Sequence, residues 1–141
     1  FIKKSNLSNC EIIIDDKIKA HLLKKSIFAV AKSGTVSLEI CKAKIPSIIF
    51  YKINFINYII IKMLVKTKYV NIINIAANKE IIPELLQSKC NAENICNLVS
   101  EFLDNPSKIK EQIEKTKVVL SNFKTDKPPS ELASAALNKI I

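Results

Sequence analysis

Short apolar runs alternate with segments of helical period over the first half of the chain. Residues 28–32 are almost wholly apolar, whereas over 35–45 apolar residues such as those at 36, 40 and 43 stand three or four positions apart. An unbroken apolar run is typical of a buried strand, and the wider spacing is typical of an amphipathic helix. The pattern predicts strands at 11–14, 28–32, 47–51 and 69–73, and helices at 15–25, 35–45 and 54–68. Such alternation favours an α/β fold with a Rossmann-like parallel sheet and helical crossovers.

The predicted strand–turn–helix at 28–45 contains the only glycine of the chain, Gly34. A helix that begins at such a turn leaves its first N–H groups without intrahelical partners, and its dipole adds positive potential there. Ser33, Gly34 and Thr35 are therefore candidates for binding phosphate. Glu39 lies four residues after Thr35 on the same helix face, where its carboxylate can accept hydrogen bonds from two ribose hydroxyls. The alternative is an ordinary β–turn–α connection with a capping serine and a solvated Glu39.

Residues 54–68 combine aromatic and long aliphatic side chains with lysines collected toward the C-terminal end. The segment is shorter than the roughly 20 apolar residues that a membrane-spanning helix needs. Two interpretations stay open. Lys62, Lys66 and Lys68 beside an apolar helix face indicate contact with anionic head groups at a membrane surface. A buried crossover helix, with lysines at the negative end of its dipole, fits the same residues.

Polar residues follow the last predicted strand, and helices fill the rest of the chain. Asn74 comes directly after the strand at 69–73, at the carboxyl edge of the sheet where α/β proteins bind ligands. Residues 78–79 are typical of a turn, and Pro83 suits the first turn of a helix that holds Glu84 and Gln87. Further helices are predicted at 92–103, 106–123 and 130–140.

The positive charge of the chain comes from lysine alone. There are 22 Lys and no Arg, with a formal net charge of +9, which favours anionic partners such as nucleotides, nucleic acid or acidic membrane surfaces. The lack of arginine argues against sequence-specific nucleic-acid recognition, because arginine is the usual reader of guanine edges. One histidine, His21, and four cysteines without a C-x-x-C pair give no zinc motif. The thiols are interpreted as reduced, with Cys41 a small core residue.

Several segments, taken together, resemble one family. They are 31–39 (Ala-Lys-Ser-Gly-Thr-Val-Ser-Leu-Glu), Pro46 with 50–52 (Phe-Tyr-Lys), 64–70 (Leu-Val-Lys-Thr-Lys-Tyr-Val), Asn74, and 83–87 (Pro-Glu-Leu-Leu-Gln). In order and spacing they resemble the C-terminal part of bacterial lipid-A-disaccharide synthases, from residue 12 to residue 103 with a continuation through the last helix. Collinear motifs are much more specific than the turn at 33–35 alone.

This resemblance implies a glycosyltransferase of the GT-B architecture, which is built from two Rossmann-like domains. The chain would be the C-terminal, donor-binding half, with an α/β part at 1–104 and C-terminal helices at 105–141. The family transfers 2,3-diacylglucosamine from UDP-2,3-diacylglucosamine to 2,3-diacylglucosamine 1-phosphate, with no metal or other cofactor. The resemblance also implies a cytoplasmic protein, peripheral to the inner face of the cytoplasmic membrane, with no nucleic-acid partner.

By motif match, the resemblance implies these donor-site residues: Ser33, Gly34 and Thr35 at the diphosphate, Glu39 at the ribose, Asn74 at the donor phosphate and sugar, and Glu84 and Gln87 in the matching helix. Two departures from the family pattern bear on them. Ile73 stands where the family usually has proline, which puts the fine positioning of Asn74 in question. Asn78-Lys79 stands where the family usually has Gly-Arg; asparagine tolerates a left-handed turn nearly as well as glycine, so the fold can survive.

The chain begins with Phe rather than Met, and its 141 residues suit one domain rather than two. We therefore expect a fragment that lacks the N-terminal acceptor domain and the catalytic residues, and that is inactive alone. Whether a homodimer or a separate upstream chain completes it stays open. Two alternative functions also stay open: an inactive remnant of a split gene, and a basic module that binds nucleic acid nonspecifically.

Overall fold

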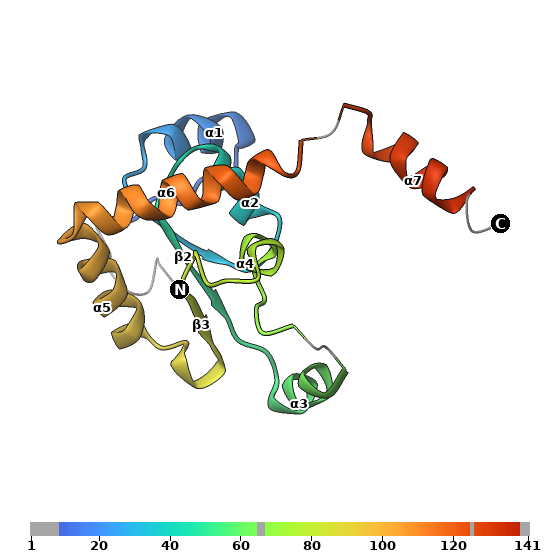
Figure 1. Ribbon diagram of the computed structural model, residues 1–141. Helices are drawn as coiled ribbons and strands as arrows, with labels where there is room; N and C mark the ends of the chain where they lie inside the picture. The colour runs from blue at the N-terminus through green and yellow to red at the C-terminus, as the bar shows by residue number, and fades with distance from the viewer. Residues whose placement is uncertain (1–8, 65–66, 125, 139–141) are drawn as a thin grey trace.

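The computed structural model describes residues 9–64, 67–124 and 126–138 (Figure 1). Three parallel strands form a sheet in the order β1-β2-β3, with β1 at Ala29–Lys32, β2 at Ser47–Tyr51 and β3 at Glu84–Leu86. The helices are α1 (Asp16–Lys25), α2 (Val36–Lys42), α3 (Phe55–Leu64), α4 (Ile72–Ala77), the 3-10 turn η2 (Gln87–Lys89), α5 (Ala92–Leu103), α6 (Pro106–Ser121) and α7 (Pro129–Leu137). The predicted α/β fold with a parallel sheet and a helical C-terminus is confirmed.

Local chemistry explains where several helices begin. The Asp15 carboxylate accepts hydrogen bonds from the N–H groups of Lys17 and Ile18, at 2.8 and 3.0 Å, and caps α1. The Asn91 side chain caps α5 in the same way, and α6 starts at Pro106, whose missing N–H costs nothing in a first turn. These helices were predicted with starts within one residue of those observed, because the signals are local.

The core lies on both faces of β2. Ile48 and Ile49 have no exposed surface, and successive residues of a strand point to opposite faces, so both faces are covered. Ile49 belongs to one apolar cluster with Ile40 of α2, Ile73 of α4 and Val119 of α6. These contacts place α2, α4 and α6 together over one side of the sheet, while α5 also contacts β2.

A buried glutamine ties α6 to the sheet. Gln112 has an exposed fraction of 4%. Its Oε1 accepts from the Ser47 N–H at 2.7 Å, and its Nε2 donates to the carbonyls of Ser47 and Ile81, at 2.9 and 3.3 Å. One side chain therefore joins the start of β2 to the segment that leads into β3.

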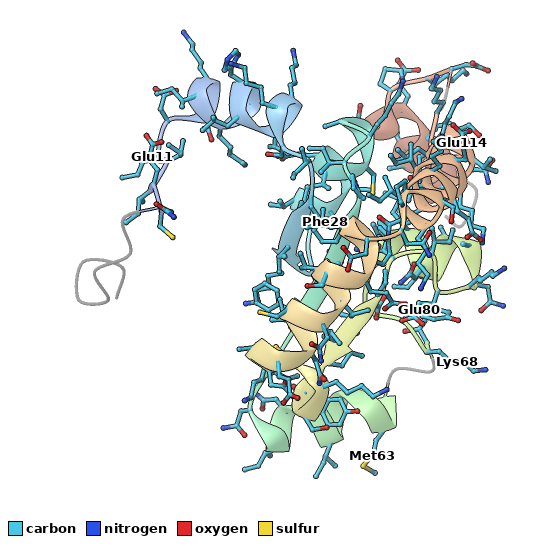
Figure 2. All side chains as sticks on the ribbon, turned by 90° about the vertical axis from the view of Figure 1, so that its left-hand side faces the viewer. Glu11, Phe28, Met63, Lys68, Glu80 and Glu114 are labelled. Carbon is cyan, nitrogen blue, oxygen red and sulfur yellow. The ribbon has the colours of Figure 1, made fainter. Side chains whose placement is uncertain are left out.

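The predicted strand at 11–14 is wrong. These residues form neither strand nor helix, and Ile12 and Ile14 have exposed fractions of 62% and 90%. A strand exists only when its backbone pairs with a neighbour, and no described strand pairs with this segment. Figure 2 shows Glu11 well away from the sheet.

Two further predictions, a strand at 69–73 and a helix beginning at Pro83, are wrong. The Asn71 side chain accepts from the Ile73 N–H at 2.9 Å and starts α4 there, so Asn74 lies inside a helix. The third strand is instead β3, which pairs in parallel with β2 directly after Pro83. Proline is tolerated at a strand's start, and its carbonyl accepts from the Ile49 N–H at 2.9 Å.

Other local predictions are confirmed. Asn78 ends α4 in the left-handed conformation with φ 47°, as the turn at 78–79 required. Cys41 is buried, and burial raises the pKa of its thiol to about 11, so it is a neutral core residue at physiological pH. His21 is exposed. The predicted last helix is α7, and residues 139–140 of that prediction lie outside the described residues.

Candidate functional site

The carboxyl ends of the three strands meet at one edge of the sheet, because the strands are parallel. The turn at 33–35 follows β1, Lys52 and Ile53 follow β2, and Gln87 follows β3. Lys32, the last residue of β1, holds its Nζ 5.7 Å from the centre of the Tyr51 ring at the end of β2. Open α/β sheets bind ligands at this edge, and the candidate site consists of the residues that lie there.

The turn at 33–35 lies against the segment that leads into α4. Ser33 Oγ donates to the Val70 carbonyl at 3.1 Å. Gly34 has φ 156°, which L side chains rarely adopt, although a Cβ there would meet no atom within 4 Å. Thr35 makes no side-chain bond to α2, and its surface and that of Gly34 are exposed. Neither the Ser33 nor the Thr35 hydroxyl therefore caps α2, as the interpretation of an ordinary connection with a capping serine requires. The exposed turn is open to a ligand.

Glu84 of β3 holds the same segment from the other side. Its carboxylate accepts hydrogen bonds from the N–H groups of Val70 and Asn71, at 2.8 and 2.9 Å, and from Asn74 Nδ2 at 2.7 Å. The Val70 peptide groups are therefore fixed by Ser33 through the carbonyl and by Glu84 through the N–H. Three residues predicted from separate motifs, Ser33, Asn74 and Glu84, belong to one hydrogen-bond network.

Asn74 is fully buried at the centre of this network. Its Oδ1 accepts from the N–H groups of Ile81 and Ile82, at 2.8 and 2.9 Å, and its Nδ2 donates to the Ile82 carbonyl at 2.7 Å as well as to Glu84. These bonds use the full hydrogen-bonding capacity of a side-chain amide. Asn74 is thus a brace for the loop before β3, and its predicted contact with the donor stays a prediction.

Gln87 extends the pairing of β2 and β3 with its side chain. Its Oε1 accepts from the Ile53 N–H at 2.9 Å, and its Nε2 donates to the Ile53 carbonyl at 3.1 Å. Its own backbone has φ 49°, a left-handed conformation that is uncommon for residues other than glycine. The two side-chain bonds of Gln87 fix the residues after β3 against Ile53, at the position where the left-handed turn occurs.

A cavity of about 700 Å³ opens beside this brace. It is lined by Glu84 and Gln87 and by five polar residues that were not predicted as site residues: Lys52, Tyr58, Ser88, Lys89 and Asn91. Asn91 carried a usable signal, since asparagine before an apolar helix is a typical cap. Lys52 belongs to the matching segment 50–52, but neither lysine stood out as a site residue, because lysine is common along the whole chain.

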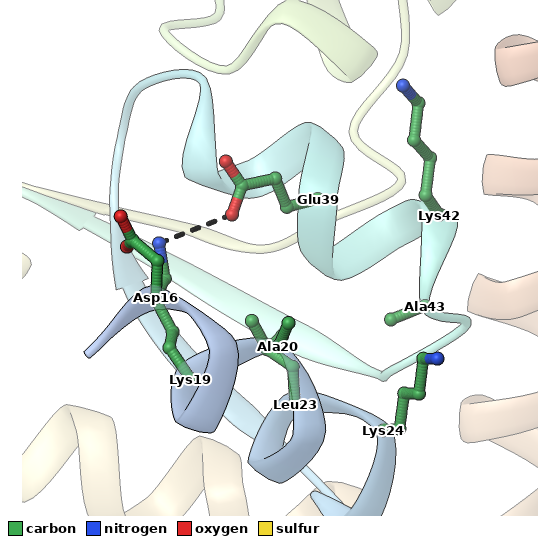
Figure 3. Close-up of a pocket in the computed structure, with 8 residues that line it drawn as sticks. All are labelled: Asp16, Lys19, Ala20, Leu23, Lys24, Glu39, Lys42 and Ala43. Atoms are coloured by element: carbon green, nitrogen blue, oxygen red, sulfur yellow. Dashed lines mark ion pairs between the residues drawn. The ribbon is translucent and has the colours of Figure 1, made fainter. Parts of the chain in front are cut away.

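Glu39 lies apart from this group, on the face of α2 that meets α1. Its carboxylate pairs with Lys19 Nζ at 3.3 Å (Figure 3), and both side chains are about half exposed. The two residues line a second cavity of about 620 Å³ between α1 and α2. An exposed ion pair contributes about 0–1 kcal/mol, so a ligand can displace Lys19 from Glu39 at small cost.

The segment predicted to touch a membrane is an exposed apolar helix over part of its length. Ile56, Ile59 and Met63 of α3 have exposed fractions of 66%, 43% and 81%, and Met63 points away from the rest of the protein (Figure 2). These side chains lack the burial that a crossover helix requires. Lys68 is exposed, whereas Lys66 and the Lys62 side chain lie outside the described residues. No helix of the described residues is long and apolar enough to cross a membrane.

Comparison with known proteins identifies relatives of this chain. A model of the family described as lipid-A-disaccharide synthetase matches residues 1–137. The lipid-A-disaccharide synthase of Rickettsia prowazekii (strain Madrid E) is 39% identical over 133 residues, which cover 93% of this chain and 34% of that protein. That of Rickettsia bellii (strain OSU 85-389) is 40% identical over 126 residues, 88% of this chain and 32% of that protein.

The chain thus spans about a third of the length of these relatives. The match covers the turn at 33–35, the network around Asn74 and the cavity at the end of β3. The resemblance found in the motifs is confirmed, and the chain belongs to the lipid-A-disaccharide synthetase family.

Proposed function

We propose that this chain is the C-terminal, donor-binding part of a lipid-A-disaccharide synthase, a hexosyltransferase of the GT-B architecture. The enzyme would transfer 2,3-diacylglucosamine from UDP to 2,3-diacylglucosamine 1-phosphate in lipid A biosynthesis. The observation that carries the proposal is the exposed turn at 33–35, at the carboxyl edge of a parallel sheet, in a chain of this family. Because the chain spans about a third of its relatives, the catalytic groups are assigned to the part outside it, and the chain alone would be inactive.

The residues at the sheet edge take distinct roles in this proposal. Gly34 and Thr35 present exposed backbone and hydroxyl groups to the donor diphosphate, with Ser33 at its side. Lys52 and Lys89, which line the cavity at the end of β3, supply positive charge for the same group. Asn74, Glu84 and Gln87 are positioning residues, because their polar atoms bond to the protein's own backbone.

Glu39 would accept hydrogen bonds from the ribose hydroxyls of the donor. Changing Glu39→Ala in the enzyme of which this chain is part should weaken UDP binding by about 1–3 kcal/mol, since a hydrogen bond between a charged group and the ligand is lost. Isothermal titration calorimetry with UDP measures the effect.

Lys19→Ala is the matched control, because it removes the ion-pair partner of Glu39 and leaves the carboxylate free. UDP affinity should stay the same or rise slightly in this variant. If Glu39→Ala binds UDP as tightly as the unmodified enzyme, the ribose assignment is wrong. UDP binding itself argues against an inactive remnant, and family membership favours the enzyme over a nonspecific nucleic-acid module.

The apolar face of α3, with the lysines in its last turn and beyond it, would rest on the inner leaflet of the cytoplasmic membrane, from which an acylated sugar must enter the site. Each lysine near an anionic surface contributes about 1 kcal/mol. Changing Lys62, Lys66 and Lys68 together to glutamine should release the enzyme from anionic vesicles while UDP binding stays intact. Vesicle co-sedimentation at low and high salt measures the release.

A second triple variant, Lys17→Gln with Lys24→Gln and Lys25→Gln, controls for net charge. These lysines are exposed on α1, away from α3. Equal vesicle binding by the two triple variants would contradict a specific membrane surface at α3, and so would retention of the first variant on the vesicles.

A further inference from the structure

A groove lies between α2 and α6, near the amino edge of the sheet, whereas the turn at 33–35 lies at the carboxyl edge. α2 begins at the carboxyl edge of the sheet and runs back, so its last residues lie at the amino edge, where β2 begins. There α2, α6 and the residues that follow each helix line a cavity of about 490 Å³ whose apolar walls include Leu38, Leu120 and Phe123. Lys42 also lines the cavity beside Glu39, whereas the other residues of the groove line neither that cavity nor the one at the end of β3.

The rim of this groove is cationic. Lys42, Lys44 and Lys124 line it, and none of them has an ion-pair partner among the residues that the structure describes. A fourth lysine, Lys117, also lines it and pairs with Glu114 at 3.7 Å, on the exposed surface of α6. No carboxylate belongs to the described lining. An apolar cavity with a rim of one charge is complementary to a ligand that is apolar at one end and anionic at the other.

The deep side of the groove adds no negative charge. Cys41 lines it and is buried, and because burial raises the pKa of its thiol to about 11 the group stays neutral at physiological pH. The volume falls within the range of small-molecule pockets, roughly 300–1,000 Å³, which suits a single aliphatic chain.

We propose that this groove binds a single-chain anionic amphiphile, with its aliphatic chain against Leu38, Leu120 and Phe123 and its head group among Lys42, Lys44 and Lys124. The head group is a phosphate or a carboxylate, since both are recognised by the same ammonium groups. This site shares only Lys42 with the cavity beside Glu39, and it does not depend on the function proposed above.

The chain contains no tryptophan, so Phe123→Trp introduces a single fluorescent reporter at the groove. Phe123 is partly exposed, and a larger ring there has room toward solvent. Titration with octyl, decyl and dodecyl phosphate below their micellar concentrations should shift the emission, with affinity rising about three- to fourfold for each added methylene that is buried. Dodecanoate tests the carboxylate as the alternative head group.

Inorganic phosphate and dodecyltrimethylammonium should give no binding, because the first lacks the chain and the second carries the wrong charge. Calorimetry on the unmodified protein repeats the chain-length series without any substitution, so the test does not depend on the reporter variant. Binding that is independent of chain length, or equal for the cationic amphiphile, would overturn the proposal.

The rim is tested by Lys42→Gln, Lys44→Gln and Lys124→Gln combined, which should weaken dodecyl phosphate binding about tenfold or more, as expected for three lost ion pairs. The matched control combines Lys17→Gln, Lys25→Gln and Lys110→Gln, three exposed lysines that do not line the groove. The control should bind as the unmodified protein does. Equal losses in both triple variants would show that only net charge matters and would refute the site.

Discussion

Changing Asn74→Ala is expected to lower the free energy of unfolding by about 3–4 kcal/mol. The amide of Asn74 is fully buried and makes four hydrogen bonds. Without it, the N–H groups of Ile81 and Ile82 and the Ile82 carbonyl lose their partners, and each unsatisfied buried group costs about 1–3 kcal/mol. Urea unfolding followed by circular dichroism measures the loss.

Asn97→Ala is the control, because Asn97 is exposed on α5 and surface substitutions usually stay within about 0.5 kcal/mol. A loss below about 1 kcal/mol for Asn74→Ala would contradict the bracing role. Asn74→Asp gives a second readout, since it sets a carboxylate against Glu84 in place of the donor now at 2.7 Å.

Two facing carboxylates raise the pKa of one of them in the folded state. The folded Asn74→Asp variant therefore holds a proton that the unfolded chain releases more readily. Its stability relative to the unmodified protein should be greatest at low pH and should fall as the pH rises through the raised pKa. Unfolding curves at acidic and neutral pH measure this change, and a pH-independent difference would show that the two carboxyl groups do not interact.

Changing Gln112→Ala is expected to cost about 3 kcal/mol of folding stability. The buried amide of Gln112 bonds both the N–H and the carbonyl of Ser47, and Ser47 has an exposed fraction of 1%. Water cannot replace these bonds unless the α6–β2 contact opens, so their loss leaves unpaired groups in addition to a cavity. The measurement is the midpoint of urea unfolding at constant m-value.

Lys110→Ala serves as the control on the exposed face of the same helix. It changes helix propensity and charge but touches no buried hydrogen bond, and it should leave stability within about 0.5 kcal/mol. Equal effects of Gln112→Ala and Lys110→Ala would mean that the link between α6 and β2 contributes little to stability.

The Asn74 network also connects stability to the donor site. Asn74 holds Glu84, Glu84 holds the Val70 N–H, and the Val70 carbonyl accepts from Ser33 beside Gly34. Loosening the buried end of this chain of hydrogen bonds removes the support behind the exposed turn. Asn74 and Glu84, which belong to the matching motifs, therefore affect ligand affinity by positioning the backbone beside the turn at 33–35.

The sequence by itself determined the parts of this protein that rest on short-range chemistry. The starts of α1, α5 and α6 follow from Asp15, Asn91 and Pro106, which act on N–H groups or dihedral angles of their own first turn. The unit β1–turn–α2–β2 also follows from local order, because an apolar run, a glycine turn and a helical period come in direct succession. These segments hold the turn at 33–35 that the candidate site is built on.

Only the tertiary structure decided which later segment joins the sheet. Residues 69–73 and 84–86 are both short apolar-rich runs, and sequence period cannot choose between them. The choice depends on the backbone of β2, which pairs with Glu84–Leu86, and on the Glu84 carboxylate, which binds the N–H groups of Val70 and Asn71 in the rival segment. The strand predicted at 11–14 was wrong for the same reason. A strand needs a neighbouring strand to pair with, and the pattern of apolar residues does not show whether one is present.

The roles of the site residues were likewise decided by long-range contacts. Asn74 looked like a surface ligand because it followed an apolar run, yet it is buried and bonded to residues 81, 82 and 84. Glu39 lies on the predicted helix face but pairs with Lys19 from α1. Hydrogen-bond capacity is a property of one residue, which the sequence shows, whereas the partner that uses it depends on where distant segments meet in the fold.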